Sequence, residues 1–467
     1  MANKGSEYSI PGYVQRYLKD NGYTVAITPM LNYINRWYRW LRADGDFYEH
    51  NKIDAKGHRY RYKRRSVQPA RRVCREWASL LLNEDVVITT ENESINEWLE
   101  GYLDSINFLS QGQDLITRSF ALGTGAWALW VSLDPVAGNK VFVRRYDARM
   151  VLPLSYDDDG VSECAFVTRA AYGGKLVDQL QMHVKVGDTY FIKTKMWKDE
   201  IPFTPEGIIT DFNSLSPYPT FSIVSPAIDN TCVDVSPYGE SVFHAAIDTL
   251  QAVDICFDAI YNEVDMSKMR IFIGDMLIDK QPDGEGGTTV IPFGKDDVIF
   301  RKLTSSKEDL IETFAPNLRT EAQLNAYHAA WQTLGDLTGF GIDYFSVNTG
   351  RRGLRTATEV SADNSALMRN IHKHENILED AIASILRAVI SCGQSWLDCP
   401  AGDPGIININ FDDSIITDVQ SEKAQSLLEV GRTLNAWEYR VEYYGETEEE
   451  AKANVPGIVQ APESYGR

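Results

Sequence analysis

The residue types best suited to chemistry gather in one segment, where His372, His374, Glu375 and Glu379 offer imidazole and carboxylate ligands. In a helix, residues i and i+2 point about 200° apart, so the two histidines cannot share one metal ion. His372 could meet Glu375 and Glu379 on one helix face, but a charge pair on the helix surface is the commoner origin of that spacing. A metal-dependent nuclease that uses these carboxylates is therefore an alternative hypothesis only.

Other sites of catalysis or cofactor binding are not indicated by the sequence. No GxxxxGK[ST] pattern exists, and Gly173-Gly174-Lys175 lacks both the earlier glycine and the following Ser or Thr of a phosphate-binding loop. The glycines of 283–287 read as a hairpin turn. No local Ser-His-Asp or Cys-His signature is present, and the scattered cysteines form no CxxC pair, which predicts buried or incidental thiols. We expect no cofactor, no metal and no enzymatic activity.

A loop rich in Gly and Arg, residues 349–355, leads directly into an unusually long helical segment. Thr356 and Glu359 have the spacing of a capping box, which defines a helix start. Neither Pro nor Gly follows before Gly393, so at ~1.5 Å per residue the pattern predicts roughly 55 Å of helix. The loop's arginines are Arg351, Arg352 and Arg355.

A second long helix is predicted over 240–268, where apolar residues recur at helical spacing from Phe243 to Val264. Four acids fall on a neighbouring face of this predicted helix, and they are Glu240, Asp254, Asp258 and Asp265. A solvated edge would explain them in a monomer. The alternative interpretation is a surface that faces a partner of the same charge and repels it.

Composition narrows the function further. The chain has 467 residues, a net charge of −20 and a pI near 4.8, which argues against a protein that binds nucleic acid by neutralising phosphates.

No apolar run reaches the ~18 residues of a membrane span, and the N-terminus has no signal-peptide core, so we expect a chain that stays in the cytosol where it is made. Residues 56–75 hold nine Lys or Arg and no acid, and they predict either a patch for an acidic partner or the solvated side of a hairpin before a helix at Pro69.

The order of the predicted elements gives an α+β chain. Helices occupy the first eighty residues, and residues 83–210 hold a helix or two and then many short alternating runs, which predict a β-rich layer. The long helix from Glu240 follows, then a small β-rich module, and then an Ala-rich helix from Pro316, whose small residues permit close helix packing. The module therefore lies at the tip of a helical hairpin. After the helix from Thr356 come a short strand, three small helices and a tail.

Three long stretches resemble the portal proteins of tailed bacteriophages, most closely the siphophage type from Gram-positive hosts. They are "SPYGESVFHAAIDTLQAVDICFDAIYNEVDMSKMRIFIG", "TATEVSADNSALMRNIHKHENILEDAI" and "FDDSIITDVQSEKAQSLLEVGRTLNAWEYRVEYYGETEEEA". The resemblance covers nearly the whole chain in order. It implies a ring of subunits, a dodecamer, at one vertex of the capsid, with a central channel.

The resemblance also assigns parts of the portal fold to segments of this chain. It implies a wing over 1–239, a stem helix over 240–268 and a clip over 269–315. A second stem helix over 316–337, a tunnel loop over 338–355, and the long wing helix with its return strand over 356–412 follow. The crown and C-terminal tail occupy 413–467.

Function and partners also follow from the resemblance. It implies a structural, non-catalytic conduit in the virion, made in the bacterial cytoplasm, through which double-stranded DNA is packaged and ejected without sequence specificity. Implied partners are further copies of the chain, a terminase ATPase that docks at the clip, the major capsid and scaffolding proteins, and head-completion or adaptor proteins. No membrane is involved. A non-ring structural adaptor with the same long helices is a further alternative.

This function gives the charged residues possible roles. DNA carries one negative charge per ~1.7 Å of duplex axis, so a basic channel would bind the duplex and stall it. The acids Glu240, Asp254, Asp258 and Asp265 would instead line the channel and keep DNA sliding. Arg351, Arg352 and Arg355 would contact DNA phosphates from the tunnel loop, or else form salt bridges between subunits.

Overall fold

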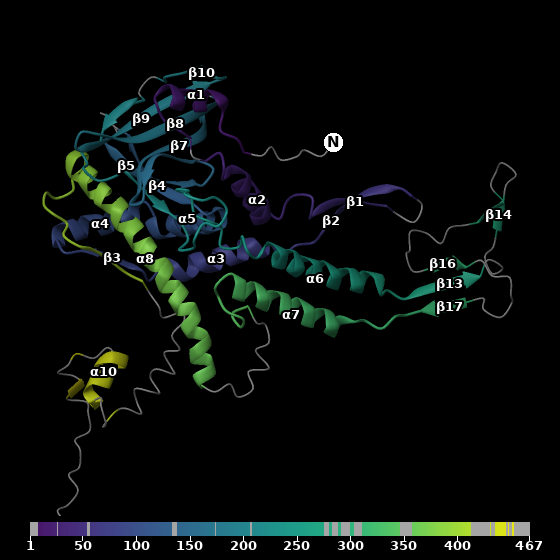
Figure 1. The fold of residues 1–467 in the computed structure, drawn as a ribbon. Coiled ribbons are helices and arrows are strands. Elements are labelled where there is room, and N and C mark those ends of the chain that lie inside the picture. Colours follow the sequence, from purple (N-terminus) through teal and green to yellow (C-terminus); the bar gives the residue numbers. More distant parts are fainter. Residues whose placement is uncertain are drawn as a thin grey trace, which may run out of the picture. The chain divides into compact units, whose positions relative to one another are not determined.

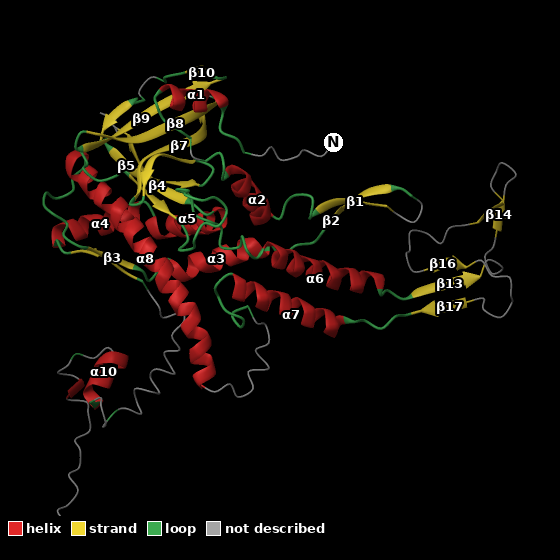
Figure 2. Ribbon diagram, in the orientation of Figure 1, coloured by secondary structure: helices red, strands yellow, loops and turns green. Residues whose placement is uncertain are grey.

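The computed structural model describes residues 8–25, 27–53, 57–132, 138–172, 174–205, 208–274, 280–282, 288–290, 299–302, 311–345, 357–411, 430, 435–444, 447 and 451–452. The chain divides into two compact units, Met1–Ile409 and Asn410–Arg467. Helices and strands both make up the first unit, so the predicted α+β class is confirmed (Figure 2). None of the described helices is long and apolar enough to cross a membrane.

The N-terminal part is mainly helical. Its helices are α1 (Gly12–Asp20), α2 (Leu31–Arg42), α3 (Pro69–Leu81), α4 (Glu93–Ser105) and α5 (Phe108–Leu122). The strands β1 (Glu49–Ile53) and β2 (Arg59–Lys63) form an antiparallel hairpin between α2 and α3, and β3 (Val87–Thr90) precedes α4. Helix α3 starts with Pro69, a residue pre-set for the first helical turn, as the sequence predicted.

The predicted β-rich layer is confirmed as two sheets. Its strands are β4 (Gly125–Ser132), β5 (Lys140–Asp147), β6 (Val151–Asp157), β7 (Gly160–Tyr172), β8 (Lys175–Val186), β9 (Thr189–Lys198), β10 (Ile201–Pro202), β11 (Asp211–Asn213) and β12 (Phe221–Val224). One sheet has the order β10-β9-β8-β7-β6 with β11 beside β9, and the other has the order β12-β4-β5. All these pairings are antiparallel, and short connections join the successive strands from β6 to β10.

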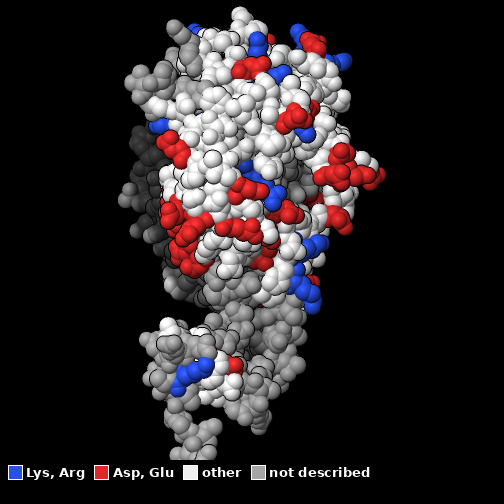
Figure 3. All heavy atoms as spheres, turned by 90° about the vertical axis from the view of Figure 1, so that its left-hand side faces the viewer, with Lys and Arg blue, Asp and Glu red and all other residues white. Residues whose placement is uncertain are grey.

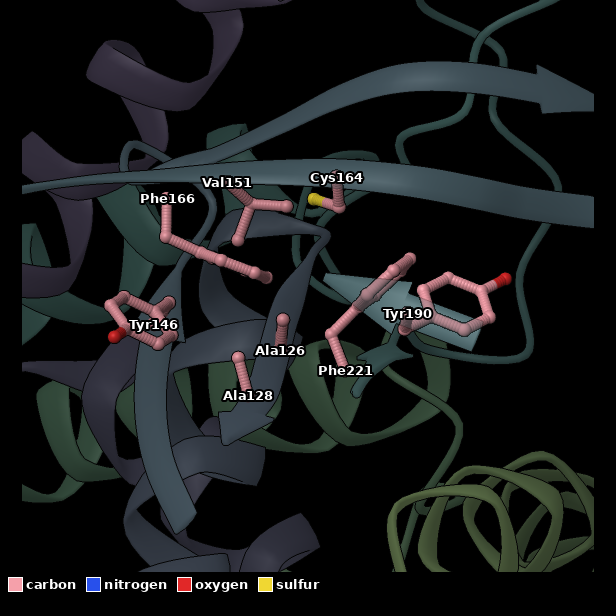
Figure 4. Packing of buried hydrophobic residues seen from close by; sticks show 8 residues of the cluster. All are labelled: Ala126, Ala128, Tyr146, Val151, Cys164, Phe166, Tyr190 and Phe221. Carbon is pink, nitrogen blue, oxygen red and sulfur yellow. The ribbon is translucent and has the colours of Figure 1, made fainter. Parts of the chain in front are cut away.

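A core of buried side chains joins the two sheets (Figure 4). Phe166 stacks on Tyr146 with ring centroids 4.4 Å apart and meets Phe221 edge-on, so β7 of one sheet packs on β5 and β12 of the other. Ala126 and Ala128 on β4 leave room for these rings. The remaining members shown are Val151, Cys164 and Tyr190. This core makes the sheets a fixed base for the helices that follow.

The helical hairpin with a β-rich tip is also present. Helix α6 (Ile247–Met266) leads into β13 (Arg270–Gly274), and β17 (Ile311–Phe314) leads into α7 (Thr320–Leu337), so that α6 and α7 lie side by side (Figure 1). Strand β13 pairs in parallel with β16 (Ile299–Lys302) and antiparallel with β17, while β14 (Lys280–Pro282) pairs with β15 (Thr288–Val290). The helix starts later than predicted, because 240–246 form successive turns in which His244 N–H bonds to Ser241 and Ala246 N–H to Phe243.

The long helix predicted from Thr356 is confirmed as α8 (Ala357–Trp396), 40 residues and therefore ~60 Å. Its described part packs on α3, β4, β5 and β12, and after it β18 (Ile407–Asn410) pairs with β3. Thr356, the expected capping residue, lies outside the described residues. In the second unit, α10 (Ala436–Tyr444) is a described helix, and Ala451 and Lys452 are also helical; most of the rest of the region where three small helices were predicted lies outside the described residues.

Gly393 lies inside α8, although glycine disfavours a helix interior. A Cβ at this position would lie 2.6 Å from Cη2 of Trp98 on α4, closer than packed atoms approach. The missing side chain therefore lets α4 and α8 pack tightly.

We expect Gly393→Ala to destabilise the chain by about 1–3 kcal/mol, because the clash with Trp98 outweighs the gain in helix propensity. The matched control is Gly101→Ala on α4, where no atom lies within 4 Å of the added Cβ, and it should stabilise the chain by up to about 1 kcal/mol. Urea unfolding of both variants measures the two effects. Equal urea midpoints for the two variants would show that the contact between α4 and α8 does not constrain position 393.

Candidate functional site

The α6–α7 pair is held together by a half-buried ion pair and by aromatic side chains. Arg319 forms two parallel bonds to Glu263, with Nε 3.0 Å from Oε1 and Nη2 2.7 Å from Oε2. The carboxylate is buried while the guanidinium is largely exposed, and the hydrogen bonds from Arg319 hold the pKa of Glu263 below its usual value. The ring centroids of Phe257 on α6 and Tyr327 on α7 lie 6.2 Å apart. The end of the pair next to the β-containing module and the middle of the pair are therefore both fixed.

The predicted acidic face on α6 is not a continuous exposed surface. Asp254 is fully buried and accepts hydrogen bonds from Tyr48 Oη (2.8 Å), Ser66 Oγ (2.7 Å) and Val67 N (2.9 Å). Burial raises the pKa of this carboxyl, while the hydrogen bonds from Ser66 and Tyr48 oppose the rise. Asp254 therefore attaches the segment around β1 and β2 to the helix.

Asp258 acts in the same way one turn later. It is 6% exposed and accepts bonds from the Tyr62 hydroxyl, from Arg65 N at 3.3 Å and from Asn262 Nδ2 at 3.1 Å. Burial alone would raise its pKa, but these hydrogen bonds, that from Tyr62 first, bring the pKa below its usual value. The chain thus uses this carboxylate internally as well.

Glu240 precedes α6 and is also buried, where its Oε2 accepts bonds from Thr231 N (2.9 Å) and Thr231 Oγ1 (2.7 Å). Only Asp265 is exposed, and it pairs with Lys268 at 2.7 Å. A carboxylate enclosed by its own chain presents almost no surface to a channel. We therefore correct the expectation that Glu240, Asp254 and Asp258 line a channel. The same role for Asp265 stays a prediction.

The predicted tunnel-loop arginines, Arg351, Arg352 and Arg355, lie outside the described residues, so their role stays a prediction. The segment just before them, 338–345, is described and is tightly held. Trp77 Nε1 donates to Thr338 O (3.1 Å), and Asn370 Nδ2 on α8 donates to Gly339 O (2.8 Å). Phe340 packs on Trp77 with ring centroids 4.4 Å apart. This segment therefore joins the end of α7 to both α3 and α8.

The two histidines of α8 point to different environments, as the helix geometry predicted. His372 is half-exposed and pairs with Glu375 at 2.9 Å. His374 is buried against Trp77 and Phe120, and its Nδ1 accepts the backbone N–H of Ala227 at 3.0 Å. Burial lowers the pKa of His374 to about 4. A shared metal site with both histidines is therefore excluded by geometry.

One group of three possible metal ligands exists among the described residues, namely Cys232, Glu240 and His244. The Sγ of Cys232 lies 3.4 Å from Glu240 Oε2 and 3.5 Å from His244 Nε2. Trp37 Nε1, which can only donate, bonds to His244 Nδ1 at 3.0 Å, so the neutral ring carries its proton on Nε2. That proton occupies the lone pair a metal would need.

Hydrogen bonding accounts for this group without a metal. Burial and Glu240 raise the pKa of Cys232 to about 12, so the thiol keeps its proton and donates it to the carboxylate. The hydrogen bonds then form a chain: Trp37 donates to His244, His244 Nε2 donates to the sulfur of Cys232, and the Cys232 thiol donates to Glu240. Sequence reasoning missed this group because its three members lie in the loop and turns before α6 with no recognisable spacing, and their partner Trp37 comes from α2.

The basic segment of 56–75 folds as a hairpin and a helix start, which was one of its two predicted readings. On β2, Arg59, Arg61 and Lys63 are all exposed. Four of the six cysteines are buried and the other two are half-buried, and all are free thiols, as expected.

Comparison with known proteins identifies the class. The family model "Phage portal protein, SPP1 Gp6-like" matches residues 28–430. The chain therefore belongs to the phage portal protein family, which makes it a head-to-tail connector of the virion.

The other comparisons add little. No curated protein matches the sequence. Among solved structures, a chain of "Neck of native GTA particle computed with C12 symmetry" is similar, with 14% identity, coverage of 79% of this chain and 88% of that chain, and a TM-score of 0.35. Such a score is too low to carry an argument from that structure to this one.

We expect Asp254→Asn to destabilise the chain by about 2–3 kcal/mol, because all three buried donors lose a charged acceptor and at least one of them then faces an NH2 group. The control, Asp265→Asn, changes an exposed pair and should stay within about 0.5 kcal/mol. Urea unfolding compares the two. If neither variant changed stability, the internal role of Asp254 would be refuted.

Stability should fall in mild acid because His374 is buried in its neutral form. Its folded pKa of about 4 lies below the unfolded value near 6.5, so the unfolded state binds the extra proton, and stability is full above about 6.5 and lost as pH falls toward 4. The loss amounts to about 3 kcal/mol at ~1.4 kcal/mol per unit.

His374→Asn tests this dependence, since its Oδ1 can accept the N–H of Ala227 without titrating. Unfolding free energies measured between pH 7 and 4 should show a flatter dependence in this variant. The remaining slope includes His183, whose pKa burial lowers to about 3. An unchanged slope would rule out His374 as the titrating group.

Proposed function

We propose that copies of this chain form a ring, a dodecamer, whose central channel double-stranded DNA crosses when the phage head is filled and emptied. Membership of the portal family supports this function. The observation that carries it is the α6–α7 pair, where Ile255 and Tyr261 on α6 and Leu324 on α7 are 47%, 49% and 44% exposed. Apolar side chains left uncovered along a helix pair are typical of a surface that a further subunit covers.

In this proposal α6 and α7 form the stem and run along the channel, and the β-containing module between them forms the clip. Asp265 would repel the duplex, and Arg351, Arg352 and Arg355 would meet phosphates or neighbouring subunits. The clip would receive the terminase ATPase, while other surfaces would meet capsid, scaffolding and adaptor proteins. The chain itself would be a passive conduit without catalysis.

Electron microscopy of the purified chain, with its mass measured by light scattering, tests the proposal. Rings with a central hole wide enough for a DNA duplex are the expected result. A compact dimer that never forms rings would refute the conduit and favour a non-ring adaptor. DNA cleavage that requires a divalent metal ion would favour the nuclease alternative instead.

Changing the exposed apolar residues of the stem should prevent ring formation without unfolding the subunit. We expect Ile255→Lys combined with Leu324→Lys to leave a folded monomer, because both side chains already face solvent in the single chain. The control is Val186→Lys on β8, an apolar residue of similar exposure (46%), which should still form rings. Light scattering and circular dichroism report mass and folding. Rings of normal mass from the double variant would exclude this surface as the subunit contact.

A further inference from the structure

The hairpin of β1 and β2, which we call the arm (residues 49–53 and 59–63), is only partly covered by the described residues of its own chain. It pairs from Glu49↔Lys63 to Ile53↔Arg59, and no third described strand joins it. Towards its tip, Ile53 is 64% and Tyr60 is 48% exposed. A two-stranded hairpin alone in water is marginally stable, so this one depends on packing against other surfaces, and its exposed tip is available to a further one.

One face of the arm is held by the stem and the other is presented outward. Tyr62 bonds to Asp258, and its ring lies under Lys52 Nζ at 3.3 Å. Since side chains alternate along a strand, Arg59, Arg61 and Lys63 lie on the face opposite Tyr62. Arg61 pairs with Glu49 across the strands, which leaves this exposed face with a net positive charge. The arm therefore offers cations on a support fixed to α6.

The surface that best complements these cations is another copy of the same chain. The chain carries a net charge of −20, so identical subunits repel one another unless opposite charges meet at their contacts. Acidic side chains gather on the side of the molecule where α4 lies, and the exposed row there is Glu93, Glu97, Glu100 and Asp104 (Figure 3). A ring joins two different faces of each subunit, so a basic arm on one copy can meet an acidic surface on the next.

We infer that the arm docks on an acidic surface of the neighbouring copy and holds the ring together. This inference rests on the proposed ring function and adds a contact that the stem does not supply. Three cations and the one acid paired with Arg61 leave a net positive charge on each arm, and this charge, repeated at every junction, would offset the repulsion between acidic neighbours. Salt screens exposed charge pairs, so the contribution of the arm to ring assembly should become smaller as the salt concentration rises.

The test is charge reversal of the arm, Arg59→Glu, Arg61→Glu and Lys63→Glu together, in the full chain. The matched control reverses three exposed lysines on the sheets, Lys140, Lys175 and Lys185, and so changes the net charge by the same amount. Light scattering over a range of protein concentrations, with electron microscopy, measures ring formation. We expect the arm variant to need at least tenfold more protein than the control to form rings.

A neutral variant guards against misfolding of the reversed arm. Arg59→Gln, Arg61→Gln and Lys63→Gln together should weaken assembly less and should also reduce its dependence on sodium chloride. Circular dichroism confirms that each variant is folded.

The possible outcomes separate the two proposals. Arm variants that form rings as readily as the control overturn the inference and leave the ring function intact. Normal rings that lose binding to a short DNA duplex at low salt would assign the arm to DNA and likewise overturn it. A wild-type chain that stays monomeric at every concentration overturns the ring function together with the inference.

Discussion

The buried carboxylate of Asp254 is the interaction on which much of the arrangement depends. It takes three hydrogen bonds from a segment nearly two hundred residues earlier in the sequence, at Tyr48, Ser66 and Val67. A buried charge is tolerated only when donors surround it, so this helix face can form only with that segment in place. The position of the arm on α6 is therefore set by the same bonds that keep the charge satisfied.

Most of the fold could be predicted from local patterns. The alternating runs between 83 and 210 predicted strands, and the absence of Pro or Gly between Thr356 and Gly393 predicted α8, because both signals come from neighbours in sequence. The start of α6 could not be predicted in this way. Apolar spacing continues back to Phe243, but backbone bonds from His244 to Ser241 and from Ala246 to Phe243 form turns there, and these turns leave no mark on the apolar spacing. Glycine at 393 did not end the helix because packing against Trp98 overrides propensity there.

The candidate site was much harder to predict than the fold. The sequence placed Asp254 and Asp258 on one helix face, which is correct, but it could not show that Tyr48, Ser66 and Tyr62 cover that face. Buried and exposed acids have the same spacing, and only their partners in space distinguish them. The separation of His372 from His374 was predictable because it depends on helix geometry alone.

The anchored segment 338–345 has a mechanical consequence. Helix α7 ends where Trp77 and Asn370 hold the carbonyls of Thr338 and Gly339, and the rings of Phe340 and Trp77 fill the space between them. A force pulling along α7 would be borne at that point by α3 and α8 together. Because α8 packs on strands of the β12-β4-β5 sheet, the load would pass into the sheet core and be spread over many contacts, so the helix pair could carry tension without yielding at a single bond.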